Sequence, residues 1–241
     1  PPVSQSSSHD YSGPVFQRYY LQGRTLAGIG YLGMIGAKPK YPIKAIPSFS
    51  SKKELIDHIE NLWKKIAPHG AGSWMGKDCQ FFQLGVEQGK DECREHLNTC
   101  LEWLERNQDP QSGLWGDKNQ SLLQRINGTF KIIAHLCWGM GWKLPNPRKL
   151  IDSALTHLEN EEIFGEGKEV PCADGNVFTC IDQGLYETDY SYRYEECKER
   201  TLHRLSHIIK AYVSNKDKQE LGTISIAIGL SYSSPRLLNE L

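Results

Sequence analysis

The residues that could carry chemistry in this 241-residue sequence follow its Gly-rich turns, where the amino ends of helices are expected. They combine a histidine with amides, cations, carboxylates, tyrosines and tryptophans. A cavity for a hydrocarbon would be lined by aromatic residues around one strong acid, so this polar set favours a hydrated ligand such as a saccharide. The residues expected to face the cavity are His69, Trp74, Lys77, Gln80, Trp115, Arg125, Asn127, Lys131, Asp174, Asn176, Asp182, Tyr190, Tyr192 and Arg193.

For an acidic polysaccharide, the simplest reaction that these residue types support is β-elimination, in which a base removes the proton next to a carboxylate. His69 would take that proton, and Tyr190 or Tyr192 would donate to the leaving oxygen. The amide of Asn127 or of Asn176 would hold the carboxylate. We therefore predict a polysaccharide lyase with His69, Asn127, Tyr190 and Tyr192 as catalytic residues. The predicted substrate-binding residues are Trp74, Trp115, Arg125, Lys131, Asn176, Asp182 and Arg193.

Each of these residues also has a structural role open to it. A histidine in a Gly-rich turn can cap a helix, and Asn127 before Gly128 suits a turn or a cap. The two tyrosines can brace the start of a helix. Arg125, which would assist Asn127 at the carboxylate, can instead pair with an acidic side chain.

Hydrolysis of a glycosidic bond is a second possible chemistry, and it would need two carboxylates roughly 5–10 Å apart across a cleft. Asp174 and Asp182 are the candidates for that pair. On one helix their spacing in sequence would place them roughly 12 Å apart on a similar face. Asp174 also suits a helix cap, and that structural role is favoured.

Composition argues against several other classes of function. The formal net charge is -1, so a nucleic-acid partner finds no strongly basic surface. No apolar run reaches the roughly 20 residues of a membrane span, and a soluble protein is expected. No Cys or His pair has the spacing of a zinc site, so neither a metal nor another cofactor is predicted. The expected partner is a small molecule or an oligosaccharide in a cavity of the inner ring.

The seven cysteines are an odd number, and Cys93, Cys100 and Cys137 lie on apolar helical stripes, as small core residues would. A full disulfide framework is therefore not expected, and the count favours a reducing compartment. Cys172 and Cys180 are close enough in the sequence to bridge within a loop.

Hydrophobic residues recur at helical spacing along the chain after a Pro- and Ser-rich arm at residues 1–13. Amphipathic helices alternate with Gly-rich, apolar ones, and similar loops recur at a period of roughly 40–50 residues. We therefore predict one all-α domain over residues 14–241, built of helical hairpins as an incomplete or small α/α toroid or an open solenoid. The predicted helices, about nine in all, cover 16–36, a segment from the Ser51–Glu54 capping box through Ile66, 75–88, 91–107, 120–139, 147–159, 175–187, 192–213 and 219–230.

The segment 103–115 carries the most specific pattern in the chain. It ends an amphipathic helix, after which Gln108 can bond the freed backbone groups and Pro110 stops the helix. Gly113 then turns the chain so that Trp115 packs beneath it. This pattern resembles the QW-type repeat of the terpenoid cyclase and protein prenyltransferase superfamily. The resemblance implies an α/α toroid with a ligand cavity at the mouth of its inner ring, but it does not imply one reaction.

The arrangement of Pro39–Pro42, His69–Gly72 and Asn176–Phe178 also resembles poorly characterised microbial proteins of that toroid shape. The sequence lacks the Asp-x-Asp-Asp acid of the cyclases, an Asp-rich magnesium motif and the zinc set of the prenyltransferases. A terpenoid-type cyclase or prenyl-chain-binding enzyme is therefore one alternative to the lyase, and a non-catalytic binding scaffold is another. An enzyme should show a closed ring with convergent polar groups, whereas a scaffold should show an open concave face.

Overall fold

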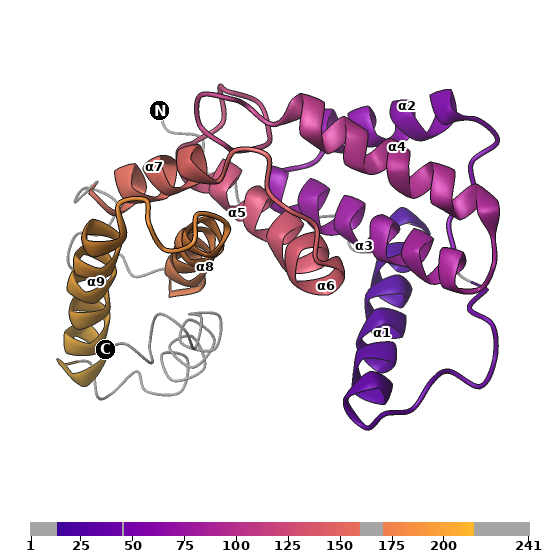
Figure 1. Ribbon diagram of the computed structural model, residues 1–241, viewed down its shortest axis with the longest axis horizontal. Helices are drawn as coiled ribbons and strands as arrows, with labels where there is room; N and C mark the ends of the chain where they lie inside the picture. The colour runs from indigo at the N-terminus through magenta and orange to yellow at the C-terminus, as the bar shows by residue number, and fades with distance from the viewer. Residues whose placement is uncertain (1–13, 45, 160–170, 215–241) are drawn as a thin grey trace.

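The computed structural model describes residues 14–44, 46–159 and 171–214, and within them the chain is helical without any strand (Figure 1). The helices are α1 (Pro14–Met34), α2 (Lys52–Lys65), α3 (Pro68–Glu87), α4 (Asp91–Asn107), α5 (Leu122–Ile132), the π-helical turn η1 (Ile133–Cys137), α6 (Trp138–Met140), α7 (Pro147–Leu158), α8 (Pro171–Glu187) and α9 (Tyr194–Ser214). The prediction of an all-α fold is therefore confirmed. The predicted arm at 1–13 and the predicted helix at 219–230 lie outside the described residues.

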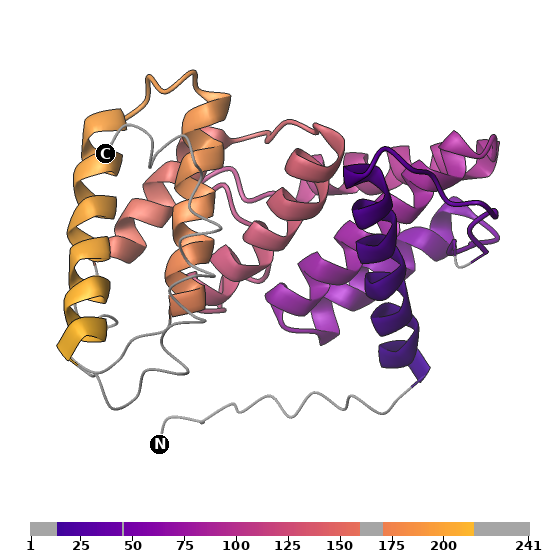
Figure 2. The ribbon, with the colours of Figure 1, turned by 90° about the horizontal axis from the view of Figure 1, so that it is seen from below.

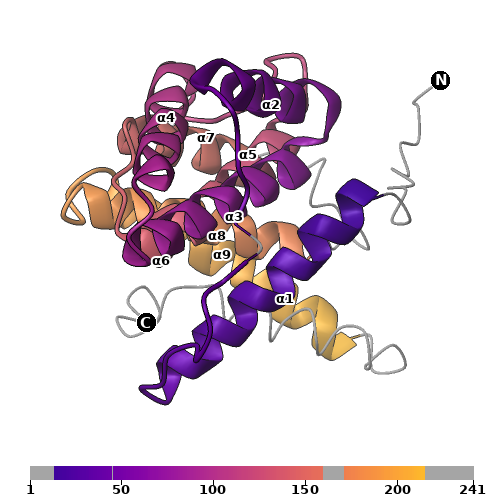
Figure 3. The same ribbon diagram turned by 90° about the vertical axis from the view of Figure 1, so that its right-hand side faces the viewer.

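The helices alternate along the chain between two layers. α3, α5 and α8 pack side by side as an inner layer, and α2, α4 and α7 cover them as an outer layer (Figures 1 and 2). α9 packs on α7 and α8, whereas α1 lies against α3 on the side away from α2 and α4 (Figure 3). The described helices form an open row with α2 toward one end and α9 at the other, so the inner layer has one long face opposite the outer helices.

The outer helix α2 shows how the sequence sets this arrangement. Its apolar stripe is buried against the inner layer, while its other side carries charged residues in water. The helix starts where the capping box predicts, because the Ser51 hydroxyl accepts from the backbone N–H of Glu54 at 3.2 Å. The Glu54 carboxylate accepts in return from the N–H of Ser50 at 2.7 Å. The other predicted helices, α3 excepted, also agree with the structure within about four residues at each described end.

The inner helix α3 begins at Pro68, so the prediction of a Gly-rich turn at 69–74 is wrong and that segment is helical. Pro68 at the first helical position has the φ that a helix needs. The glycines serve packing: a Cβ on Gly72 would collide with the carbonyl oxygen of Gly128 in α5. A Cβ on Gly128 would lie 2.7 Å from the Cβ of Pro68. The backbones of α3 and α5 therefore touch directly.

We expect Gly72→Ala to lower the free energy of unfolding by about 1–3 kcal/mol, because overpacking this contact outweighs the gain in helix propensity. Gly30→Ala is the matched control, since Gly30 also lies inside a helix but has open space around its Cβ position. There the alanine is expected to stabilise by about 0.5–1 kcal/mol. Urea denaturation measures both values, and equal shifts in the two variants would contradict a tight contact between α3 and α5.

The segment 103–115 is organised as its sequence indicates. After the end of α4, the Gln108 amide donates to the carbonyl oxygen of Gly113 at 2.9 Å. Gly113 has φ +66°, a left-handed conformation that suits glycine. The fully buried indole of Trp115 donates to the Leu104 carbonyl at 2.9 Å, which satisfies an acceptor in the last turn of α4. The segment is therefore a fixed corner that leads the chain from the outer layer to the inner one.

Candidate functional site

Polar side chains from the three inner helices form a group connected by hydrogen bonds and charge, which we call the inner-face cluster. Three of them recur at steps of four residues, which places them along one face of the helix formed by α5 and η1. Those three would be unusual on a helix that served only to fill a core. The cluster consists of Lys77 and Gln80 from α3, Asn127 and Lys131 from α5, His135 from η1 and Asn176 from α8.

An amide pair in the cluster joins α5 to α8. The Nδ2 of Asn176 donates to the Oδ1 of Asn127 at 2.8 Å, and Asn176 is only 6% exposed. The partly exposed Asn127 keeps its own Nδ2 as a donor for a ligand. The structure therefore brings together the two amides that were predicted to hold a carboxylate.

His135 lies in the π-helical turn η1, which interrupts the single helix predicted over 120–139. Its Nδ1 is 3.0 Å from the Oε1 of Gln80, and because an amide oxygen only accepts, the ring proton is assigned to Nδ1. Nε2 then carries the lone pair, and it has no hydrogen-bond partner within the described ranges. The side chain of His135 packs directly on α3, as the short distance to Gly76 shows. A Cβ on Gly76 would lie 2.6 Å from the Cβ of His135. The imidazole is held at one nitrogen and available at the other.

The inner-face cluster is cationic. Burial lowers the pKa of His135 to about 3, and the ammonium groups of Lys131 and Lys77 contribute to the shift. Burial also lowers the pKa of Lys77, which forms no ion pair or hydrogen bond with the rest of the described chain. At neutral pH His135 is thus an uncharged acceptor near two cations. A carboxylate bound beside Lys131 would offset its charge and raise the pKa of His135, so the anion would strengthen the base.

His135 was not among the residues singled out from the sequence. The available signal was its spacing from Asn127 and Lys131, because three polar residues at steps of four interrupt an otherwise apolar helix. The π-helical turn was not visible in that spacing, and it determines where the imidazole points. π-helical turns of this kind occur frequently at functional sites.

Two predicted ligand-binding residues belong to the fixed corner instead. The Nη2 of Arg125 donates to Asp109 at 3.1 Å and to the Ser112 hydroxyl at 2.9 Å, with the side chain buried. Trp115 is fully buried in the core. Neither side chain presents a surface to a ligand, because each one is committed to holding segment 103–115 in place.

His69 and Trp74, which were predicted to face the cavity, lie nearer the amino end of α3 than Lys77 does. His69 is exposed in the first turn of α3, and Trp74 is partly buried against the main core. Eight residues separate His69 from Lys77, which corresponds to roughly 12 Å along the helix. The exposed His69 is therefore a less suitable base than His135.

Tyr190, Tyr192 and Arg193 lie in the turn after α8, beyond its carboxyl end. Asn176 is near the amino end of the same helix, so roughly 16 Å of α8 separates the amide pair from this turn. The Tyr192 hydroxyl donates to Asp152 at 3.0 Å and the Nη1 of Arg193 donates to the same carboxylate at 2.8 Å. The structure therefore does not bring these tyrosines to Asn127, and their predicted role as acids in one site with it has no geometric support.

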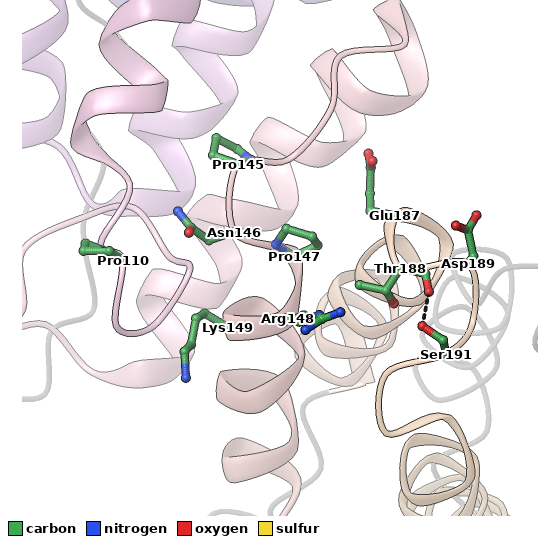
Figure 4. Close-up of a pocket in the computed structure, with 10 residues that line it drawn as sticks. All are labelled: Pro110, Pro145, Asn146, Pro147, Arg148, Lys149, Glu187, Thr188, Asp189 and Ser191. Carbon is green, nitrogen blue, oxygen red and sulfur yellow. Dashed lines mark hydrogen bonds between the residues drawn. The ribbon is translucent and has the colours of Figure 1, made fainter.

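An open cavity of about 570 Å³ lies between the amino end of α7 and the carboxyl end of α8 (Figure 4). Its lining consists of Pro110, Pro145, Asn146, Pro147, Arg148, Lys149, Glu187, Thr188, Asp189 and Ser191. The Nζ of Lys149 lies 3.4 Å from Asp152, and Glu187 accepts from Gln183 at 3.0 Å. Because the cavity lies at the end of α8 away from the amide pair, the inner-face cluster is the stronger candidate site.

Asp174 and Asp182, the carboxylates considered for hydrolysis, are both buried rather than open to a cleft. Asp174 is 1% exposed and accepts two hydrogen bonds, each 3.0 Å long, from the guanidinium of Arg204 in α9. Asp174 thus lies in the first turn of α8 and pairs with α9, while the helix cap favoured for it stays a prediction. Asp182 is also buried, at 6% exposure. The chemistry of the inner face is therefore dominated by cations and amides.

The cysteines behave as core residues. Cys93, Cys100 and Cys137 are buried free thiols, as their positions on apolar stripes predict. Cys180 is also a buried free thiol, so it does not bridge to Cys172.

In the described ranges, no group of three or more His, Cys, Asp or Glu side chains is arranged to hold a metal ion. None of the described helices is both long enough and apolar enough to cross a bilayer.

Comparisons with protein-family models, with curated proteins and with solved structures give no match for this chain. Its class follows from geometry alone. It is an all-α protein of two alternating helical layers with a cationic polar cluster on the inner face.

Proposed function

We propose that this protein is a carbohydrate-directed enzyme, a lyase that cleaves an acidic polysaccharide by β-elimination at the inner-face cluster. The observation that carries the proposal is the environment of His135. Its tautomer is fixed by Gln80, its Nε2 is open, and Lys77 and Lys131 place positive charge nearby. This combination suits a base that works beside a carboxylate.

In the proposed reaction, Nε2 of His135 removes the proton from the carbon that bears the carboxylate. The electron pair of that C–H bond becomes a C=C bond, while the bond from the next carbon to the glycosidic oxygen breaks. The imidazolium then gives its proton to the leaving oxygen, so His135 returns to the neutral form. Lys131, one helical turn from His135, would hold the carboxylate, whose negative charge grows in the transition state. The free Nδ2 of Asn127, one turn further along, would bind a neighbouring part of the polysaccharide.

We further propose that the two layers form part of an incomplete or small α/α toroid. The regular alternation of outer and inner helices supports this architecture. A terpenoid-type cyclase is less well supported, because ammonium groups would repel the carbocations of that chemistry. The open row of described helices favours one second candidate, a non-catalytic scaffold that binds the same acidic saccharide.

The test compares acidic polysaccharides with their methyl-esterified, uncharged forms. We expect the protein to generate the ultraviolet absorbance of an unsaturated uronate from the charged forms, and to lose at least about tenfold in rate on the esters, because each charge-assisted contact is lost. His69→Ala should leave the rate unchanged. Binding without product across the panel would favour the scaffold, whereas turnover of the esters at the same rate would contradict a cationic carboxylate site.

A further inference from the structure

α1 meets α3 on the side away from the outer layer (Figure 3). Lys77 of α3 reaches Gly23 of α1 at this contact. Its Nζ lies 3.3 Å from the position that a Cβ on Gly23 of α1 would take. The ammonium is partly buried, and within the described chain no carboxylate pairs with it. Asp78 attracts this ammonium from beyond ion-pair distance, but burial still lowers the pKa of Lys77, so an anion in contact would stabilise the charge.

Gln22 precedes Gly23 and gives a second, independent sign of a missing ligand. The side chain is 1% exposed, and neither its amide nitrogen nor its amide oxygen forms a hydrogen bond. Because α1 packs mainly on α3 and Gln22 is almost fully buried, Gln22 lies at the contact between the two helices. A buried amide without partners is destabilising, and leucine would fill similar space without that penalty.

We propose that the contact between α1 and α3 is a binding subsite for an oxyanion on a sugar ring, either a carboxylate or a sulfate ester, with Lys77 supplying the charge and Gln22 the hydrogen bonds. This inference rests on the proposed function and narrows its substrate class. The polysaccharide would carry an anionic group on the ring held here as well as on the ring that reacts at His135. The partly buried ammonium of Lys77 and the buried amide of Gln22 are unfavourable in the ligand-free protein, and both would bind the oxyanion in the complex.

Calorimetric titration with glucuronate, glucose 6-sulfate and glucose tests the subsite. The wild-type protein should bind one or both acidic sugars and should not bind glucose, and the acid that binds identifies the group. Gln22→Leu and Lys77→Met should each weaken that binding by about tenfold to a hundredfold, since each removes one interaction with a charged group. Lys64→Met, which removes an exposed lysine on α2, should leave it unchanged.

Thermal unfolding of the ligand-free variants supplies the second measurement. Gln22→Leu and Lys77→Met should both melt at a higher temperature than the wild type, because each removes a buried polar group without a partner. The subsite would be overturned if Gln22→Leu bound the acidic sugars as tightly as the wild type does. It would also be overturned if the wild type bound neither acid. The lyase fails independently of it if the acidic sugars bind as expected but no polysaccharide yields an unsaturated product.

Discussion

Replacing Arg204 with methionine is expected to lower the free energy of unfolding by about 3–5 kcal/mol, because it leaves the carboxylate of Asp174 buried without its cation. The two side chains are 8% and 1% exposed, and two hydrogen bonds of 3.0 Å connect them between α9 and α8. Urea denaturation followed by circular dichroism measures the loss. Arg204→Met is thus the variant for which we expect the largest effect on stability.

The matched control is another arginine of the same helix. Arg200 pairs with Glu159 at 3.4 Å, but both side chains are 46% exposed. Arg200→Met should therefore change stability by less than about 1 kcal/mol. The double variant that replaces Asp174 and Arg204 with apolar residues should recover much of the loss. A loss of the same size in both single variants would contradict the role assigned to burial.

Replacing His135 with alanine is expected to lower kcat for an acidic polysaccharide by roughly 10²–10⁴-fold, the usual contribution of a positioned general base. The KM should change little because Lys131 and Asn127 still bind the substrate. Initial rates of product absorbance give both constants. The same measurement on His69→Ala separates a role of the exposed histidine from one of His135, and a loss confined to His69→Ala would restore the base predicted from the sequence.

The pH profile adds a readout that a purely structural role of His135 would not produce. The pKa of the free protein's His135 is about 3, below the ordinary value of 6.5, so kcat/KM should stay high as the pH falls through 6.5. A bound carboxylate raises that pKa, and the acidic limb of kcat should therefore lie at a higher pH than the limb of kcat/KM. A kcat/KM limb near 6.5 would instead indicate an unperturbed histidine.

Local patterns in the sequence predicted most of the helices and the corner at 103–115. The capping box at Ser51 and the helix stop before Pro110 act within a few residues, so their outcome could be deduced without the fold. Gly72 was misassigned to a turn because it makes the contact with α5, and that contact joins segments far apart in the sequence. Glycine indicates a turn and a close helix contact equally well until the partner is known.

The candidate site was also predicted only in part, because it too depends on contacts between segments far apart in the sequence. Asn127 and Asn176 were proposed as alternative ligands of the carboxylate, and the structure connects them by a hydrogen bond. Tyr190 and Tyr192 were grouped with them by residue type alone, and α8 places them at its other end. His135 escaped notice because the orientation of its ring depends on a π-helical turn and on packing against Gly76, neither of which the local sequence pattern predicts.

The backbone contact between α3 and α5 has a consequence for how such a protein can change over evolutionary time. Gly72 and Gly128 set the distance between the two helices, and neither residue belongs to the inner-face cluster. Side chains such as Lys77 or Lys131 can therefore be exchanged without altering the spacing of the helices that carry them. A lineage built on this contact could acquire new ligands by substitution on one face, while the architecture beneath stays the same.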